Sequence, residues 1–245
     1  MRKNIFVITL VGLVARTISV AANCPNVPTA EQLHNLLIKA PSGGEEGGLF
    51  HGKREWAVVV NREGDVCAIA ASTSDPTQVW PGSLAIAKAK AYTANAFSLD
   101  DKPLSTARLY TLTQPGHSLW GIAASNPYAA PDLKPPSQGP GSGSGKIEGG
   151  LIAFGGGLPL YKNDKIVGGL GVSGDTACTD HETAKRMRNL AGLNPPGGEK
   201  VDDIVYSSVD GASIFAHPMC ENTYRDGKFL GNETPARYES ASANK

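Results

Sequence analysis

The most conspicuous candidate for chemistry is a glycine-rich run, residues 169–174 (GLGVSG), which fits the Gly-x-Gly-x-x-Gly pattern of dinucleotide-binding proteins. In those proteins the pattern opens a βαβ unit, and an acidic residue follows about 20 positions later at the end of the next strand. Here that region is residues 194–198 (NPPGG), which is a loop. We therefore expect no nucleotide site. The glycines instead permit close backbone approach, and the N–H groups that open the following helix could hold an anion.

Other side chains of the kinds used in catalysis and metal binding do not form a recognisable motif. The chain has no Cys-x-x-Cys and no His-x-x-x-His, so a zinc site is not expected. Ser173 fails the Gly-x-Ser-x-Gly frame of a nucleophile elbow, because Asp175 stands where the second glycine is required. No Ser-His-Asp arrangement can be inferred from spacing alone.

The N-terminus has the pattern of a secretory signal. Arg2 and Lys3 precede an apolar run over residues 5–15, and small residues end at Ala22. The run is shorter than the roughly 20 residues that a membrane-spanning helix needs. We expect residues 1–22 to be a cleaved signal peptide, which predicts a secreted or periplasmic protein without stable membrane insertion. A buried first helix is the alternative.

The composition excludes several classes of protein. The 245 residues include 23 Lys+Arg and 23 Asp+Glu, so the chain is not a strongly basic nucleic-acid binder. Aromatic residues make up 7%, too few for a large platform on which single-stranded nucleic acid stacks. With 40% hydrophobic residues and no net charge, the chain is expected to fold.

The four cysteines all lie beyond the signal, at Cys24, Cys67, Cys178 and Cys220. In an oxidising compartment four cysteines usually form two disulfides. Three pairings are possible, and spacing does not choose among them.

The hydrophobic pattern predicts an α+β domain with a largely antiparallel sheet. Thr29 and Gln32 form a capping box for a first helix, a second helix begins at Ser83, and a third runs from Thr179 to Gly192 with a capping box closed by Glu182. Two hairpins are expected, from residues 56–61 with 66–71 and from residues 151–161 with 165–172. Residues 203–206 and 213–216 are candidates for short strands. We expect one domain over residues 23–232, with a Gly/Pro/Ser-rich surface loop at 131–150 and a mobile tail at 233–245.

Three blocks of the sequence carry a family resemblance. Residues 154–181 (FGGGLPLYKNDKIVGGLGVSGDTACTDH) resemble the core of the GlcG/HbpS-type haem-binding family, also called the haem-degrading domain. The helix containing Lys90, Ala91, Thr93 and Ala94 is similar to the family's Lys-Ala-x-Thr-Ala helix, and residues 104–127 resemble an exported subgroup. The matching positions in the first block are Gly156, Gly157, Pro159, Gly168, Gly171, Val172, Ser173, Gly174 and Asp180. The resemblance covers roughly residues 30–220.

The resemblance implies a single domain with about five antiparallel strands flanked by helices, in a profilin-like layout, that assembles into homo-oligomers. It implies haem as the cofactor, and it implies disulfides between Cys24 and Cys67 and between Cys178 and Cys220.

Haem needs an apolar slot, an axial ligand, and cations or N–H groups for its propionates. The resemblance makes His181, beside the family's signature aspartate, the first candidate for the ligand. His117 lies near Trp120 at a position where the subgroup tends to have glycine, and Tyr110 is an alternative phenolate. Lys90 is a candidate for a propionate. Exposed histidines, core packing and a solvated basic face are the simpler alternatives. The pocket is expected near the second helix and the turn formed by Gly171, Ser173, Gly174 and Asp180.

The function that follows is an exported haem-binding protein, acting in haem uptake, storage or redox sensing. One alternative is a non-catalytic oligomeric scaffold, or a protein that binds another small ligand. A haem-degrading or peroxidase-like enzyme is the other alternative. We rank the binding protein first, the scaffold second and the enzyme third.

Overall fold

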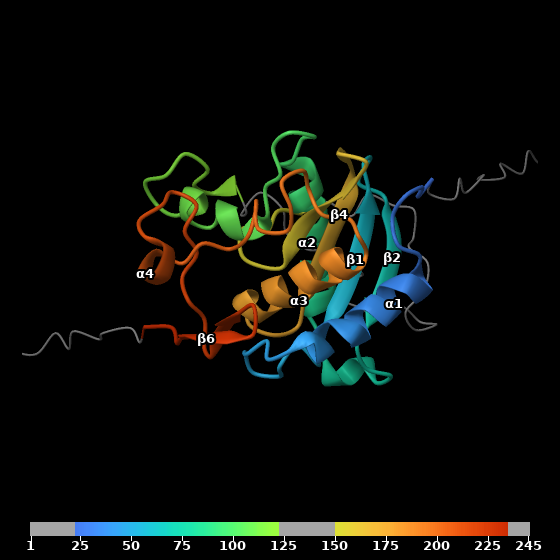
Figure 1. Ribbon diagram of the computed structural model, residues 1–245, viewed down its shortest axis with the longest axis horizontal. Coiled ribbons are helices and arrows are strands. Elements are labelled where there is room, and N and C mark those ends of the chain that lie inside the picture. The colour runs from blue at the N-terminus through green and yellow to red at the C-terminus, as the bar shows by residue number, and fades with distance from the viewer. Residues whose placement is uncertain (1–22, 123–149, 235–245) are drawn as a thin grey trace, which may run out of the picture.

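A four-stranded antiparallel sheet forms the centre of the protein. The computed structural model describes residues 23–122 and 150–234 (Figure 1). The strands are β1 (Trp56–Asn61), β2 (Val66–Ala71), β3 (Gly157–Lys162) and β4 (Lys165–Ser173), in the order β2-β1-β4-β3. Each neighbouring pair is antiparallel. This confirms the predicted α+β class. The predicted signal peptide, most of the loop at 131–150 and most of the C-terminal tail lie outside the described residues.

Three helices pack on the sheet: α1 (Ala30–Lys39), α2 (Ser83–Ala96) and α3 (Ala177–Leu190). The capping box of Thr29 and Gln32 opens α1 as predicted, and α2 begins at Ser83 as predicted. No helix in the described part of the chain is long and apolar enough to cross a membrane. The remaining elements are short: η1 (Ala40–Gly43), η2 (Pro76–Gln78), η3 (Thr106–Leu109), η4 (Thr111–Thr113), α4 (Ser207–Asp210), β5 (Thr223–Arg225) and β6 (Lys228–Gly231).

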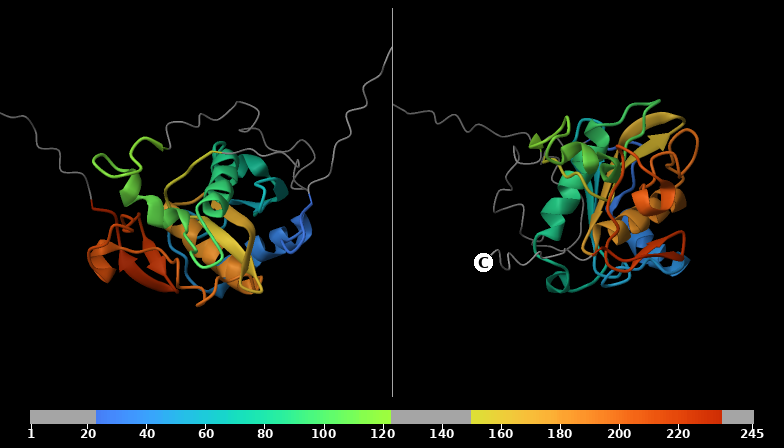
Figure 2. Two further views of the ribbon diagram at one scale, coloured as in Figure 1. Left: turned by 90° about the horizontal axis from the view of Figure 1, so that it is seen from above. Right: turned by 90° about the vertical axis from the view of Figure 1, so that its left-hand side faces the viewer.

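The helices cover both faces of the sheet, with α2 on one side and α1 and α3 on the other (Figure 2). Side chains alternate along β1, so Ala57 and Val59 join the core beneath α1 and α3. Val58 and Val60 join the core beneath α2. This arrangement explains why β1 is an unbroken apolar run, since every residue of it is buried.

Glycines let α2 lie directly on the backbone of β4. A Cβ at Gly171 would stand 1.9 Å from the Ala87 carbonyl oxygen, and one at Gly169 would stand 2.2 Å from the Ala91 carbonyl oxygen. Both distances are far below van der Waals contact, so only glycine fits. The glycine run that resembled a nucleotide motif is thus a packing surface for a helix, as its failed sequence context indicated.

The structure corrects the predicted number of strands, the strands expected after α3, and the start of the third helix. The main sheet has four strands and not five, because residues 203–206 and 213–216 form only a single parallel bridge between Val205 and Ala216. A separate hairpin, β5–β6, forms instead around Asp226 and Gly227, which both have positive φ as a tight hairpin turn requires. The third helix begins at Ala177, two residues before Thr179, and its N-cap is Thr176, whose side-chain oxygen accepts from the Thr179 N–H.

Two disulfides attach the ends of the chain to the core. Cys24 is bonded to Cys67 in β2, and Cys178 at the start of α3 is bonded to Cys220. This is the pairing that the family resemblance implied. The N-terminal segment is held further by the Asn61 side-chain amide, which donates to the Asn23 carbonyl oxygen at 3.0 Å.

Candidate functional site

A cavity of about 260 Å³ opens where β4 ends and α2 and α3 begin. Its lining is largely apolar, with two aromatic side chains at Trp80 and Phe154. Carboxylates of Asp175 and Asp180 contribute the acidic part. The full lining is Leu49, Trp80, Pro81, Gly82, Ser83, Ile86, Phe154, Ser173, Gly174, Asp175, Ala177 and Asp180. We call this the turn cavity.

The mouth of the turn cavity carries large apolar side chains in contact with solvent. Trp80 is 56% exposed and Leu49 is 50% exposed. The Trp80 ring meets Phe50 edge-on, with 6.3 Å between ring centroids, and the Arg54 guanidinium lies 4.9 Å from the Phe50 centroid. Exposed apolar groups gathered at a cavity mouth are typical of a binding site for a hydrophobic ligand.

The Asp175 carboxylate fixes the loop that carries Leu49. It accepts hydrogen bonds from the backbone N–H groups of Leu49 at 2.7 Å, Phe50 at 2.8 Å and Gly52 at 3.2 Å. It also accepts from the N–H of Thr176 at 2.7 Å. One carboxylate therefore joins two segments more than 100 residues apart, and the cavity wall is preorganised.

A buried ion pair lies directly beneath the turn cavity, and Asp180 is the partner that lines it. The Lys90 Nζ atom lies 2.6 Å from Asp180 Oδ2 and donates to the Val172 carbonyl oxygen at 2.9 Å. The Phe154 ring covers the ammonium at 4.9 Å. Burial raises the pKa of Asp180 to about 6 and lowers the pKa of Lys90, although each partner opposes the shift of the other. The Lys90 ammonium is directed to Asp180 and the Val172 carbonyl oxygen, and Lys90 is not among the residues that line the cavity.

His181 lies inside the protein and not at the cavity. Its side chain is completely buried, and Nε2 lies 3.2 Å from Asp203 Oδ1. Burial opposes ionisation of Asp203, but hydrogen bonds and charge from His181 and Lys185 outweigh it and lower the Asp203 pKa. Nε2 also lies 3.2 Å from the Ile204 backbone nitrogen, and Nδ1 is buried without a hydrogen-bond partner among the described residues. The expectation that it sits at an accessible turn failed because α3 begins earlier and turns this side chain inward.

Tyr110 and His117 also lie away from the turn cavity. The Tyr110 ring packs on His217 with 5.0 Å between centroids. His217 accepts from the Gly155 N–H and contacts the Pro218 carbonyl oxygen, and burial lowers its pKa to about 4. His117 is exposed on the turn whose N–H bonds back to the Gln114 carbonyl oxygen.

The atoms of Cys178, His217 and Cys220 lie close enough together to resemble a metal site. Both sulfurs are joined in a disulfide, so neither is available as a thiolate ligand.

The sequence model of a protein family, described as haem degrading protein HbpS-like, matches residues 49–188. The chain belongs to this family. The match includes all four strands of the sheet, α2, and most of α3, and it stops short of Cys24 and Cys220. This HbpS-like chain has no match among curated proteins.

Solved structures with similar shapes include a complex of PduOC with haem, at 20% identity and a TM-score of 0.47, covering 67% of this chain and 92% of that one. Protein ORFY of Klebsiella pneumoniae is 22% identical, with a TM-score of 0.47 and coverage of 71% and 98%. The crystal structure of HbpS is 21% identical, with a TM-score of 0.40 and coverage of 70% and 98%.

The HbpS-like chain brings together only part of the predicted site. Ser173, Gly174 and Asp180 line the turn cavity, and Lys90 lies beneath them. Gly171 serves the packing of α2, while His181, His117 and Tyr110 are elsewhere. Sequence reasoning missed Trp80, Leu49 and Phe154. The Trp-Pro-Gly segment just before α2 could have indicated Trp80. A tryptophan in a loop belongs to no buried face of a helix or strand, so it is a candidate for ligand contact.

The lining of the turn cavity suits the apolar ring of haem, but it does not offer an axial ligand for the iron within the described residues. Trp80, Phe154 and Leu49 offer apolar surface to a flat macrocycle, whereas the lining contributed by residues 23–122 and 150–234 contains no histidine, tyrosine, cysteine or methionine. Its volume also falls below the 300–1,000 Å³ usual for ligand pockets, so a tetrapyrrole would insert one edge and rest the remainder on the exposed mouth.

Proposed function

We propose that this HbpS-like protein binds haem, or a similar flat tetrapyrrole, by its ring at the turn cavity. The observation that supports this proposal is the exposed Trp80 at the mouth of an apolar cavity, placed at the turn that the family resemblance indicated. Haem would supply a planar aromatic surface with iron at its centre. The chain supplies apolar contact and orientation.

Each part of the turn cavity has a role in this proposal. Trp80 and Phe154 provide aromatic surface, and such contacts contribute about 0.5–1.5 kcal/mol beyond the area that they bury. Asp175 holds Leu49 in place before the ligand arrives, which lowers the ordering cost of binding. The Lys90–Asp180 pair keeps the floor rigid.

A titration with two ligands tests the proposal. Haemin and iron-free protoporphyrin IX are added separately to the mature, oxidised protein, and absorbance is compared with the free pigments. Because the described part of the lining offers no axial ligand, we expect saturable spectral shifts for both pigments, with affinities within a few-fold of each other.

Substitutions then locate the site. Trp80→Ala is expected to lower the affinity for both pigments about tenfold. Trp120→Ala is the matched control, since Trp120 is 64% exposed and does not line the cavity. His181→Ala and His117→Ala are expected to leave the affinity unchanged. Haemin binding that is lost in a histidine variant and unaffected in Trp80→Ala would contradict the proposal, as would the lack of any spectral shift at micromolar haemin.

The biological setting remains a prediction. We propose export after cleavage of residues 1–22, which N-terminal sequencing of the protein released by its host would test. We also propose assembly into a homo-oligomer, to be measured by sedimentation equilibrium. Ascorbate and oxygen added to the haem complex would distinguish the two uses of haem: a stable Soret band indicates binding or storage, and loss faster than for free haem indicates degradation.

A further inference from the structure

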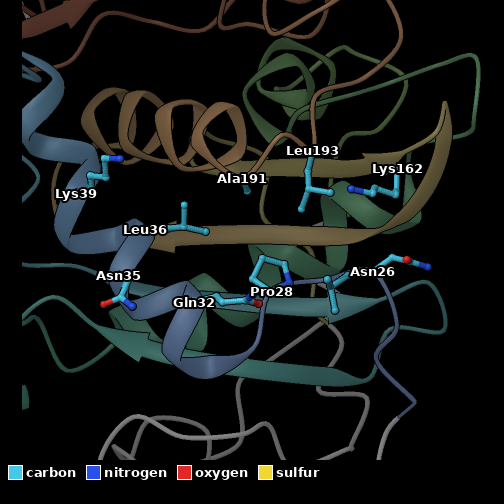
Figure 3. Close-up of a pocket in the computed structure, with 10 residues that line it drawn as sticks. Asn26, Pro28, Gln32, Asn35, Leu36, Lys39, Lys162, Ala191 and Leu193 are labelled. Atoms are coloured by element: carbon cyan, nitrogen blue, oxygen red, sulfur yellow. The ribbon is translucent and has the colours of Figure 1, made fainter.

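A second and larger cavity lies on the other face of the sheet, along α1 (Figure 3). Its volume is about 480 Å³, within the usual range for small-molecule sites. We call it the α1 groove. It is lined by Asn26, Val27, Pro28, Gln32, Asn35, Leu36, Lys39, Lys162, Ala191 and Leu193.

One wall of the α1 groove is a stripe of helix surface. Gln32, Asn35, Leu36 and Lys39 are spaced i, i+3, i+4 and i+7, so they share one face of α1. Leu33 and Leu37 point instead into the core. At a rise of 1.5 Å per residue, the stripe is about 10 Å long.

The floor of the α1 groove is apolar and firmly packed. Leu193 belongs to the hydrophobic core, and Val27, Leu36 and Ala191 pack against it while remaining partly open to solvent. The opposite wall, Asn26 to Pro28, follows directly after Cys24, whose disulfide to Cys67 ties it to β2. The groove is therefore preformed.

The charges of the α1 groove are of one sign. Lys39 and Lys162 line it from opposite ends, with Leu36, Ala191 and Leu193 between them (Figure 3). No aspartate or glutamate is among its lining residues, and neither lysine forms an ion pair within residues 23–122 and 150–234. The chain as a whole has equal numbers of acidic and basic residues. A cationic, apolar groove on such a protein is complementary to an anion with hydrocarbon character.

We infer that the α1 groove binds an elongated small molecule with a hydrocarbon middle and a carboxylate at each end. Each carboxylate pairs with one lysine, the hydrocarbon covers the apolar floor, and the side-chain amides of Asn26 and Asn35 are available as hydrogen-bond donors. Most of the groove lies outside residues 49–188, the part of the chain that the family model matches.

Calorimetry with azelate, a nine-carbon chain with a carboxylate at both ends, tests this inference. We expect saturable binding, and several-fold weaker binding of nonanoate, which lacks one carboxylate. Because exposed ion pairs contribute at most about 1 kcal/mol, Lys39→Gln and Lys162→Gln should each lower the azelate affinity about three- to fivefold, and the double variant about tenfold or more. Lys228→Gln, at an exposed lysine outside the groove, should leave it unchanged.

Nuclear magnetic resonance supplies the location. Azelate should shift the side-chain amide signals of Asn26, Gln32 and Asn35 in the wild-type protein, and Trp80→Ala should not affect these shifts. No saturable heat at millimolar azelate, or equal affinity in the double lysine variant, would overturn the inference. Self-association that the double variant abolishes, without azelate binding, would also overturn it and identify the groove as a contact between copies.

Discussion

The two faces of the sheet differ in how β3 and β4 meet the helices that cover them. Beneath α1 and α3 the strands present side chains such as Leu158 and Leu160, which interlock with leucines and Met187 from the helices. Beneath α2 the strand β1 supplies valine side chains, but the strands β3 and β4 present glycines, and there the alanine-rich helix rests on backbone atoms. A side-chain interface can adjust by changing rotamers, whereas a backbone interface cannot. Tolerance to substitution should therefore differ sharply between the faces.

The two faces also differ in where they bury charge. Helix α3 is mostly polar in sequence, yet ten of its fourteen residues are buried. Arg188 lies fully buried against Asp202, with Nη2 2.6 Å from Oδ1, and Lys185 contacts Glu182 and Asp203. Helix α2 buries two charged side chains, Lys88 and Lys90, and Lys90 pairs with Asp180 at the edge of the turn cavity. The buried cations of α3 need acidic partners, and the segment that follows α3 supplies two of them, Asp202 and Asp203.

The largest expected effect comes from adding one methyl group to the glycine face. Gly171→Ala places a Cβ against the backbone of Ala87, so β4 and α2 must separate. We expect a loss of about 4 kcal/mol or more in the free energy of unfolding, measured by urea denaturation. Gly43→Ala is the control, because the nearest atom to its added Cβ is a flexible Arg186 side chain at 3.6 Å. Equal stability of the two variants would refute the distinction between the faces.

Removing side-chain volume from the other face should cost less. Leu158→Ala leaves a cavity beneath α1 and α3, for which a loss of about 3 kcal/mol is typical. Because the surrounding leucines and Met187 can relax, the variant should remain folded, with a midpoint of urea denaturation lowered and an unchanged slope. A Leu158→Ala protein less stable than Gly171→Ala would reverse the comparison.

The smallest effect depends on pH and concerns Glu46, which is buried against α3. Burial raises its pKa to about 7, against the opposing effects of Thr183 and the nearby Arg186, while Glu182 and Asp175 raise it further. A carboxyl with a raised pKa in the folded state holds its proton more tightly there than when unfolded. Stability is therefore lost as pH rises from about 4.5 to 7.

Glu46→Gln removes the ionisable carboxyl and therefore the loss of stability that its ionisation causes. The difference in free energy of unfolding between variant and wild type should shift in favour of the variant between pH 5 and pH 8. His217, whose pKa is lowered to about 4, destabilises the protein as pH falls through the same region, but it does so in both proteins and cancels in the difference. Glu45→Gln is the matched control, since the Glu45 carboxyl is exposed and its pKa is lowered. Parallel pH curves for wild type and Glu46→Gln would contradict the assignment.

Local signals explain what could be predicted from the sequence. The Thr29 capping box, the start of α2 and both hairpins of the main sheet depend on neighbouring residues, and all of them form. The second hairpin is shorter than predicted, because β3 begins at Gly157 and not at residue 151. The Asp226-Gly227 turn was equally local and was overlooked. The site depends on residues far apart in the chain, because Asp175 meets Leu49 and Lys90 meets Asp180 only after folding. A histidine beside a glycine turn gives no local sign that the helix will bury it.

The two disulfides determine how the protein would respond to mechanical force. A stretching load applied at the two chain ends passes through the Cys24–Cys67 and Cys178–Cys220 bridges and bypasses the segments that they enclose. The first enclosed segment contains α1 and β1, and the second contains nearly all of α3. Each loop spans 43 or 42 residues, so each bridge withholds roughly 140 Å of extended chain. Until a reductant cleaves the bridges, tension would not extend the segments that contain β1 and α3. The segment between Cys67 and Cys178, which contains α2 and the glycine-containing strands β3 and β4, would be free to unfold.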